Sequence, residues 1–296
     1  MKGTLQHILY ICIVLLFSNC EKELQFSNPD FEQKLVINGF ENSDSLMKIG
    51  VGFSSSTLSE PSLNNVNGLG DLLVLKDGLL LYSGGIAIQN GEMTIPYKPL
   101  KGSYYEIQLA YGELSPIRAV DTVPQNTPVM LIDTVISQEN RYRINLTLDD
   151  GEEGDHYLLT LRYNGKELVE NDSVDVSLPL TFESSEKIFL SNIRTVADGR
   201  YFAIFDDNGW NNTSRNIELL IGNKVAERPN FTPKEVVVEL KNISKNMYDY
   251  YIDINNNTNV YGGPLASISR VTGNIDNGLG AFCFYTQTVR TKRLKP

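Results

Sequence analysis

Short stretches of alternating apolar and polar residues are the feature that most restricts how this chain can fold. In Met47–Phe53 every second residue is apolar, with Lys48, Gly50 and Gly52 between them. Because successive side chains of a β-strand point to opposite faces, this pattern predicts a strand with one buried face. Comparable stretches recur along the chain and are bounded by Gly, Pro or Asn. The sequence therefore predicts a mainly β protein.

The spacing of these strands predicts two domains. A cluster of strand-breaking residues at Asp121–Pro128 divides the predicted strands into two groups. Strands of the first group recur at roughly 8–12 residues, as in an immunoglobulin-like sandwich. We therefore predict two β-sandwich domains, the first immunoglobulin-like (residues 34–125) and the second larger (residues 126–296). Asp77-Gly78 and Asn164-Gly165 each predict a tight hairpin turn.

One segment of the second domain follows a helical period instead. Ser244 can cap a helix, and Met247, Tyr250 and Tyr251 then fall on one face of it. The sequence predicts a single helix near residues 245–256.

The beginning of the chain has the pattern of an exported protein. A positively charged start precedes the apolar run Ile8–Phe17, which is too short to span a bilayer as a helix. Cys20 follows after Ser18-Asn19, a loose form of the motif at which bacterial lipoproteins are cleaved and acylated. We predict a lipoprotein signal peptide at residues 1–19, lipid attachment at Cys20 and a tether at residues 20–33. The alternative is an ordinary secretory signal with an incidental cysteine.

The residues after Cys20 and the overall charge indicate a location. Glu21 and Glu23 around Lys22 resemble the charged sorting signal that directs Bacteroidota lipoproteins to the outer face of the outer membrane. The formal net charge of −10 argues against nucleic-acid binding, which relies on basic patches. Of three cysteines, only Cys283 lies outside the signal peptide and the acylation position, and we expect it to be a buried apolar residue.

Two polar clusters are candidate binding sites. The first is an acidic loop whose closely spaced carboxylates could hold Ca²⁺ as oxygen ligands, although solvated acidic loops are common. It contains Asp149, Asp150, Glu152, Glu153 and Asp155. The second cluster joins Asp206, Asp207 and Asn208 to the single Trp210, a combination that could stack and hydrogen-bond a sugar. The alternative is that Trp210 fills the interior of its own domain.

No catalytic site is predicted. His156 is the one histidine beyond the leader, and the G-x-S-x-G turn of serine hydrolases is absent. A pair of carboxylates for glycoside hydrolysis cannot be singled out among 36 acidic residues. Apart from the candidate Ca²⁺, no cofactor is expected.

Five segments together form a familiar pattern: Lys34–Gly39, Gly102–Ile107, Ala119–Pro124, Ile243–Tyr251 and Gly273–Phe282. They resemble a Bacteroidota lipoprotein family known only as domain of unknown function 4249. The resemblance implies a surface-exposed outer-membrane lipoprotein, often encoded beside a TonB-dependent transporter, and it carries over no catalytic residue.

The resulting hypothesis is a non-enzymatic binding or accessory lipoprotein that works with a TonB-dependent transporter in nutrient uptake. Its ligand would be a glycan or a peptide. The alternatives are a structural or adhesive surface protein without a small ligand, and a carboxylate-based glycan-active enzyme.

Overall fold

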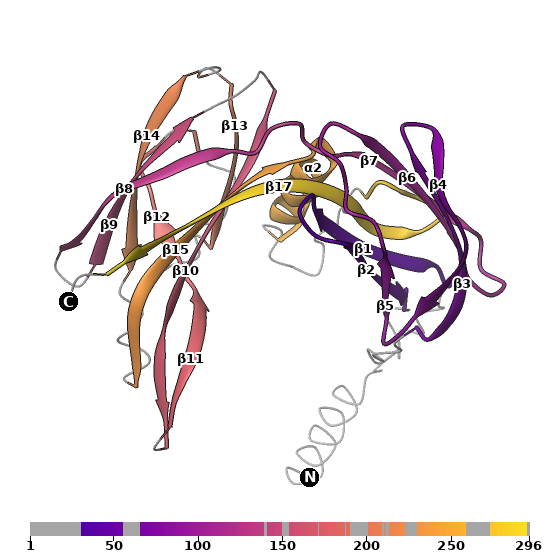
Figure 1. The fold of residues 1–296 in the computed structure, drawn as a ribbon, viewed down its shortest axis with the longest axis horizontal. Helices are drawn as coiled ribbons and strands as arrows, with labels where there is room; N and C mark the ends of the chain where they lie inside the picture. Colours follow the sequence, from indigo (N-terminus) through magenta and orange to yellow (C-terminus); the bar gives the residue numbers. More distant parts are fainter. Residues whose placement is uncertain are drawn as a thin grey trace, which may run out of the picture. The chain divides into compact units, whose positions relative to one another are not determined.

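The described residues form a mainly β structure with several sheets and one helix, which confirms the predicted fold class. The computed structural model describes residues 31–55, 66–138, 141–149, 154–170, 172–186, 188–189, 201–208, 210, 213–222, 230–258 and 273–294. The elements in chain order (Figure 1) are β1 (Leu35–Asn42), β2 (Met47–Phe53), β3 (Gly68–Lys76), β4 (Leu79–Ile88), β5 (Glu92–Ile95), β6 (Tyr104–Ala110), β7 (Ile117–Thr122), β8 (Val129–Gln138), β9 (Arg141–Asp149), β10 (His156–Val169), β11 (Asp172–Pro179), β12 (Phe182–Glu183), β13 (Phe202–Asp206), β14 (Ser214–Gly222), β15 (Phe231–Ile243), α2 (Lys245–Thr258), β16 (Ile275–Asp276) and β17 (Leu279–Arg293).

Three sheets contain these strands. The largest has eight strands, in the order β11-β10-β15-β17-β1-β2-β5, with β13 also paired to β10. A four-stranded sheet has the order β12-β14-β9-β8, and a five-stranded sheet has the order β16-β7-β6-β3-β4. Two hydrophobic cores result: one joins β1, β2 and β5 to the five-stranded sheet, and the other joins β10 and β15 to the four-stranded sheet. The arrangement is that of sheets packed face to face across apolar cores.

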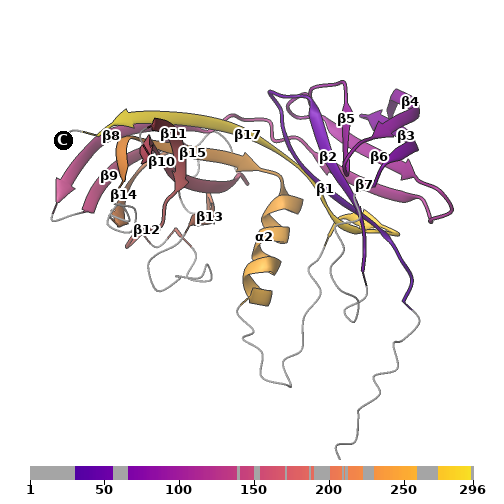
Figure 2. The ribbon, with the colours of Figure 1, turned by 90° about the horizontal axis from the view of Figure 1, so that it is seen from below.

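Strand β17 joins the two halves of the large sheet (Figure 1, Figure 2). Its first part pairs parallel with β1 and its second part pairs antiparallel with β15. The alternation of its side chains sends Phe282 and Phe284 into the first core, while Ala281 and Cys283 belong to a third cluster beside α2. The C-terminal segment therefore completes the core formed by residues 34–125.

The segment between the predicted domains is held against the same sheet. The side chain of Asn242 and the hydroxyl of Thr286 both donate to the carbonyl of Asn126, and the hydroxyl of Thr288 donates to that of Pro128. Strands from both sides of residue 125 belong to the same eight-stranded sheet. The predicted domain boundary at this residue stays a prediction.

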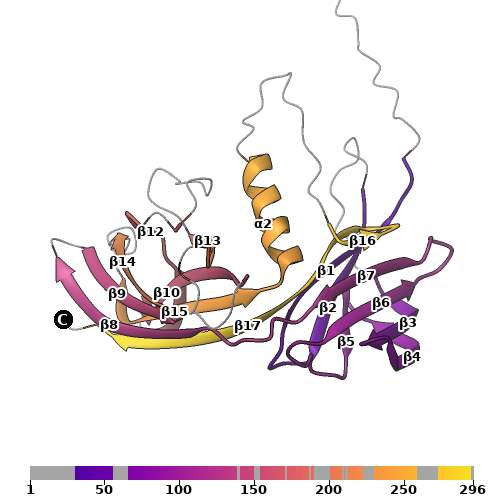
Figure 3. The same cartoon turned by 90° about the horizontal axis from the view of Figure 1, so that it is seen from above.

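The predicted helix is present as α2. The Ser244 hydroxyl oxygen accepts the N–H of Met247 at 3.3 Å, which satisfies one of the free N–H groups at the helix start. Met247 is buried, and Tyr250 and Tyr251 pack in the same cluster as Cys283 and Ala281. Figure 3 shows α2 following the end of β15 and lying beside β17. Among the described residues, no helix is long and apolar enough to cross a membrane.

One predicted hairpin is confirmed and the other is wrong. Asp77 and Gly78 both adopt positive φ, 50° and 78°, and connect β3 to β4. No turn forms at Asn164-Gly165: β10 continues through this dipeptide, with a register shift against β15 at the same point. The chain reverses after Val169 instead, where Glu170 takes a φ of 55°. Pairing with β15 along the whole of β10 overrides the local turn preference of the Asn-Gly pair.

Candidate functional site

Three of the segments that resemble the family, Ala119–Pro124, Ile243–Tyr251 and Gly273–Phe282, meet beside β17. Asp121, at the end of β7, accepts the backbone N–H of Phe284 and the side-chain N–H of Asn246, both at 2.8 Å. Burial raises the pKa of this carboxyl to about 6, against the opposing effect of these hydrogen bonds. Asn246 belongs to the first turn of α2, so Asp121 ties the helix and β7 to β17.

Asn274 makes a second attachment to the same strand. Its side-chain oxygen accepts the N–H of Phe282 at 2.9 Å, and its amide donates to the carbonyls of Phe282 and Val120 at 2.6 and 2.8 Å. The side chains of Asp121 and Asn274 thus form hydrogen bonds with backbone groups of β17 on the side away from β1. The segments Ala119–Pro124 and Gly273–Phe282 therefore carry a structural role, since unpaired buried backbone groups are costly.

The side chain of Trp210 is buried rather than open to a ligand. It is 6% exposed and packs in the second core on Tyr157 and Phe205, with ring centroids 5.9 and 6.5 Å away. Its indole N–H donates to the carbonyl of Asp206 at 3.1 Å. The packing therefore supports the interpretation in which Trp210 fills its own domain, because no face of the ring is available for stacking.

The neighbouring carboxylates organise the chain locally. Asp207 is buried and its Oδ2 accepts the backbone N–H groups of Gly154 and Asp155 at 2.8 and 2.9 Å. The side chain of Asp206 accepts the N–H of Asn208 at 3.1 Å. Asp207 thus fixes the described end of the acidic loop instead of facing a ligand.

The structure describes only the two ends of the acidic loop. Asp149 ends β9 and accepts a hydrogen bond from the Ser214 hydroxyl. Asp150, Glu152 and Glu153 lie outside the described residues. Among the described residues, no group of three or more His, Cys, Asp or Glu side chains could hold a metal ion. The candidate Ca²⁺ site therefore stays a prediction.

The two residues that could support nucleophilic chemistry are both packed. The ring of His156 lies 4.4 Å from that of Tyr248, and burial lowers its pKa, with the charge of Lys245 adding to this effect. Cys283 is fully buried, as predicted, and burial raises the pKa of its thiol. Cys283 is therefore enclosed, whereas His156 is half-buried beside α2.

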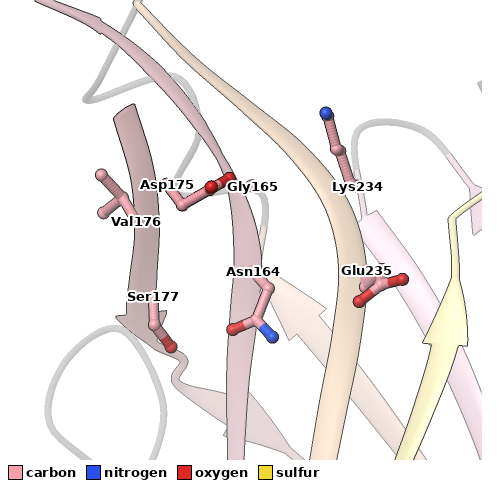
Figure 4. A pocket seen from close by; sticks show the side chains of 7 residues that line it. All are labelled: Asn164, Gly165, Asp175, Val176, Ser177, Lys234 and Glu235. Atoms are coloured by element: carbon pink, nitrogen blue, oxygen red, sulfur yellow. The ribbon is translucent and has the colours of Figure 1, made fainter. Parts of the chain in front are cut away.

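An open depression of about 390 Å³ lies where β10, β11 and β15 run side by side (Figure 4). Its lining combines amide, hydroxyl, carboxylate and ammonium groups with one small apolar side chain. The residues are Asn164, Gly165, Asp175, Val176, Ser177, Lys234 and Glu235. Sequence reasoning missed this site because it assigned Asn164-Gly165 to a turn. The register shift at that dipeptide was not visible in the local pattern.

A second surface feature is the outer edge of the five-stranded sheet. The edge strand β4 has no charged residue in Leu79–Ile88, and Leu79 and Leu80 are 75% and 64% exposed. The other edge strands that the structure describes each carry at least one acidic residue. These are Glu92 in β5, Asp133 in β8, Asp172 and Asp175 in β11, Glu183 in β12, Asp206 in β13 and Asp276 in β16.

Sheet topology and site geometry define the class of protein, a mainly β protein of packed sheets with an open polar depression and an uncharged edge strand. Comparison with protein families then places the chain. Residues 21–291 match the family described as "Domain of unknown function (DUF4249)", and the chain belongs to that family. A search of curated proteins found no match.

Proposed function

We propose that this chain is a lipid-anchored surface protein of a Bacteroidota outer membrane that binds its ligand without transforming it. It would act beside a TonB-dependent transporter in nutrient uptake. The observation that carries this proposal is the start of the chain, where an apolar run of signal-peptide length precedes Cys20. The family match begins at Glu21, directly after that cysteine, and leaves residues 1–20 outside it.

A non-enzymatic role is supported by where the candidate reactive groups lie. Asp121 and Asp207 are buried and accept backbone N–H groups, and Trp210 and Cys283 are enclosed in apolar clusters. Each of these side chains stabilises the fold. The polar depression on β10, β11 and β15 offers hydrogen-bonding groups at the surface, which suits capture of a ligand.

A protein partner is supported by the uncharged edge of β4. Sheet edges are ordinarily protected by charges, by short length or by covering elements, because their free backbone groups pair with other strands. Strand β4 extends over Leu79–Ile88 without a charge, and such edges accept an extended segment from another protein. We propose this edge as the surface that meets the transporter.

Replacement of the anchoring cysteine tests the location. In cells that express Cys20→Ser, the protein should fold but leave the outer-membrane fraction and lose labelling with a radioactive or clickable fatty acid. Cys283→Ser is the matched control, since this cysteine is buried and should not change the fractionation. A Cys20→Ser protein that remained membrane-bound and lipid-labelled would overturn the proposal.

A second experiment tests the partner. Affinity purification of the tagged lipoprotein from gently solubilised outer membranes should recover a TonB-dependent transporter. Leu80→Lys on β4 should abolish this recovery, because it places a charge on the proposed contact. Val174→Lys on the edge strand β11 is the control and should leave recovery unchanged. Recovery of no transporter, or equal recovery by both variants, would contradict the assignment.

A further inference from the structure

The depression on β10, β11 and β15 contains polar side chains that no described residue engages. The amide of Asn164, the hydroxyl of Ser177 and the ammonium of Lys234 line it, and none has a hydrogen-bond or ion-pair partner within the described part of the chain. Together they offer donors and acceptors within one small volume. A ligand that both donates and accepts hydrogen bonds would satisfy all three.

The charges around the depression nearly cancel. Asp175 and Glu235 contribute two negative charges and Lys234 one positive charge. Lys166 and Arg293 add two positive charges, since they lie 2.9 and 3.9 Å from the Asp175 and Glu235 carboxylates. Exposed pairs of this kind are weak, so a ligand hydroxyl can replace either partner without a large cost. The five charges sum to +1 and both carboxylates are paired, so no strong field of either sign acts on the depression, and a neutral ligand can bind there through hydrogen bonds.

The floor of the depression depends on a glycine. A Cβ atom at Gly165 would lie 2.3 Å from the carbonyl oxygen of Thr232 and 2.7 Å from the ring of Phe231, so no other residue fits without a shift. The register of β10 against β15 also shifts here, and such bulges bend a strand and redirect its side chains. Gly165 and the register shift beside it therefore fix the path of the backbone at the depression.

The size of the depression limits the ligand. Its volume of about 390 Å³ is near the lower end of small-molecule sites, which run from roughly 300 to 1,000 Å³. Figure 4 shows the polar groups distributed around the depression on three strands. This arrangement suits a compact molecule with hydroxyl groups on several sides.

We propose that this depression binds a neutral polyhydroxylated ligand of one or two sugar rings, held by the Asn164 amide, the Ser177 hydroxyl and the carboxylates of Asp175 and Glu235. The inference deepens the proposed binding role and rests on it for its biological meaning. It moves the predicted sugar site from Trp210, which is buried, to the outer face of the large sheet.

The experiment uses the full-length lipoprotein, purified in a detergent without a sugar headgroup. Saturation-transfer difference NMR and calorimetry would be run with cellobiose, maltose and xylobiose as neutral probes. Digalacturonic acid serves as the acidic probe, and trialanine serves as the peptide probe. At least one neutral disaccharide should bind at millimolar concentration, and the acidic and peptide probes should not.

Matched variants test the position of the site. Asn164→Ala and Ser177→Ala should each weaken binding by about five- to tenfold, the loss expected for one hydrogen bond. Ser173→Ala, on the same strand as Ser177 but outside the depression, is the control and should bind as the unsubstituted protein does.

Three results would overturn the inference: no binding by any neutral disaccharide, preferential binding of the acidic or peptide probe, or equal affinity in all variants. None of them bears on lipid attachment at Cys20 or on recovery of the transporter, so failure of this inference and failure of the proposed function are distinguishable.

Discussion

Glu41 lies in the first core and should make the folded protein sensitive to pH. Its side chain belongs to β1 and the residue is 3% exposed. One carboxylate oxygen accepts the backbone N–H of Lys48 at 2.9 Å, while the other is buried without a partner among the described residues. Burial raises the pKa from 4.5 to about 7, the hydrogen bond from Lys48 opposes this, and the nearby charge of Glu92 adds to it.

The direction of the pH effect follows from this pKa. Because the folded protein holds the Glu41 proton more tightly than the unfolded chain, the stability associated with it is fully present below pH 4.5. It is lost as the pH rises through about 7. Each pKa unit corresponds to about 1.4 kcal/mol, so the rise from 4.5 to about 7 amounts to a loss of about 3 kcal/mol.

Glu41→Gln removes the ionisation while keeping the size of the side chain and an oxygen that can accept the Lys48 N–H. At pH 8 we expect the free energy of unfolding to increase by about 2–3 kcal/mol relative to the unsubstituted protein. At pH 5 the difference should fall to about 1 kcal/mol or less, because only part of the ionisation difference remains there. Urea unfolding followed by circular dichroism at both pH values measures the two differences.

Glu92→Gln is the control for this experiment. The Glu92 side chain is exposed and lies 3.8 Å from the ammonium of Lys48, so its removal should change stability by less than about 1 kcal/mol at either pH. A Glu41→Gln protein that was less stable at pH 8, or that differed equally at pH 5 and pH 8, would refute the assignment of a buried carboxyl group with a raised pKa.

Three further substitutions test the structural roles assigned above. Asp121→Ala removes the acceptor of two N–H groups and should lower the free energy of unfolding by about 2–5 kcal/mol in urea unfolding; a loss below about 1 kcal/mol would contradict its role at β17. Gly280→Ala should prevent β17 from pairing with β1, since its Cβ would lie 1.9 Å from the Ile37 carbonyl oxygen at a φ of 100°; soluble yield and the circular dichroism spectrum report this, and a normally folded variant would refute it. Trp210→Ala should cost about 3–5 kcal/mol through the cavity it leaves, whereas disaccharide affinity should stay unchanged in the folded fraction.

Two similar turn signals show how well local sequence predicts a turn. Asp77-Gly78 and Asn164-Gly165 are similar dipeptides between apolar runs, and only the first forms a turn. Strand β10 has partners on β15 from Tyr157 to Glu167, on both sides of the dipeptide, and continuing this ladder outweighs the turn preference of two residues. The pairing partner is about 70 residues away in the chain, so the dipeptide itself holds no information about it.

The candidate site shows the same limit. The sequence singled out Trp210 because an aromatic residue beside carboxylates and amides is typical of sugar sites. Its burial depends on Tyr157 and Phe205 closing around it in the second core. The depression that is open to solvent is made by residues of three strands, and no short stretch of sequence contains more than three of them.

The sequence by itself determined local conformation. Alternating apolar residues predicted the strands, and Ser244 followed by apolar residues three and four positions apart predicted α2. What only the tertiary structure decided is which strands pair, which acids are buried and where the polar groups gather. The hydrogen bond from the Phe284 N–H to Asp121 joins residues 163 positions apart. Local conformation depends on near neighbours and can be inferred from them, whereas burial and pairing depend on contacts that exist only once the whole chain has folded.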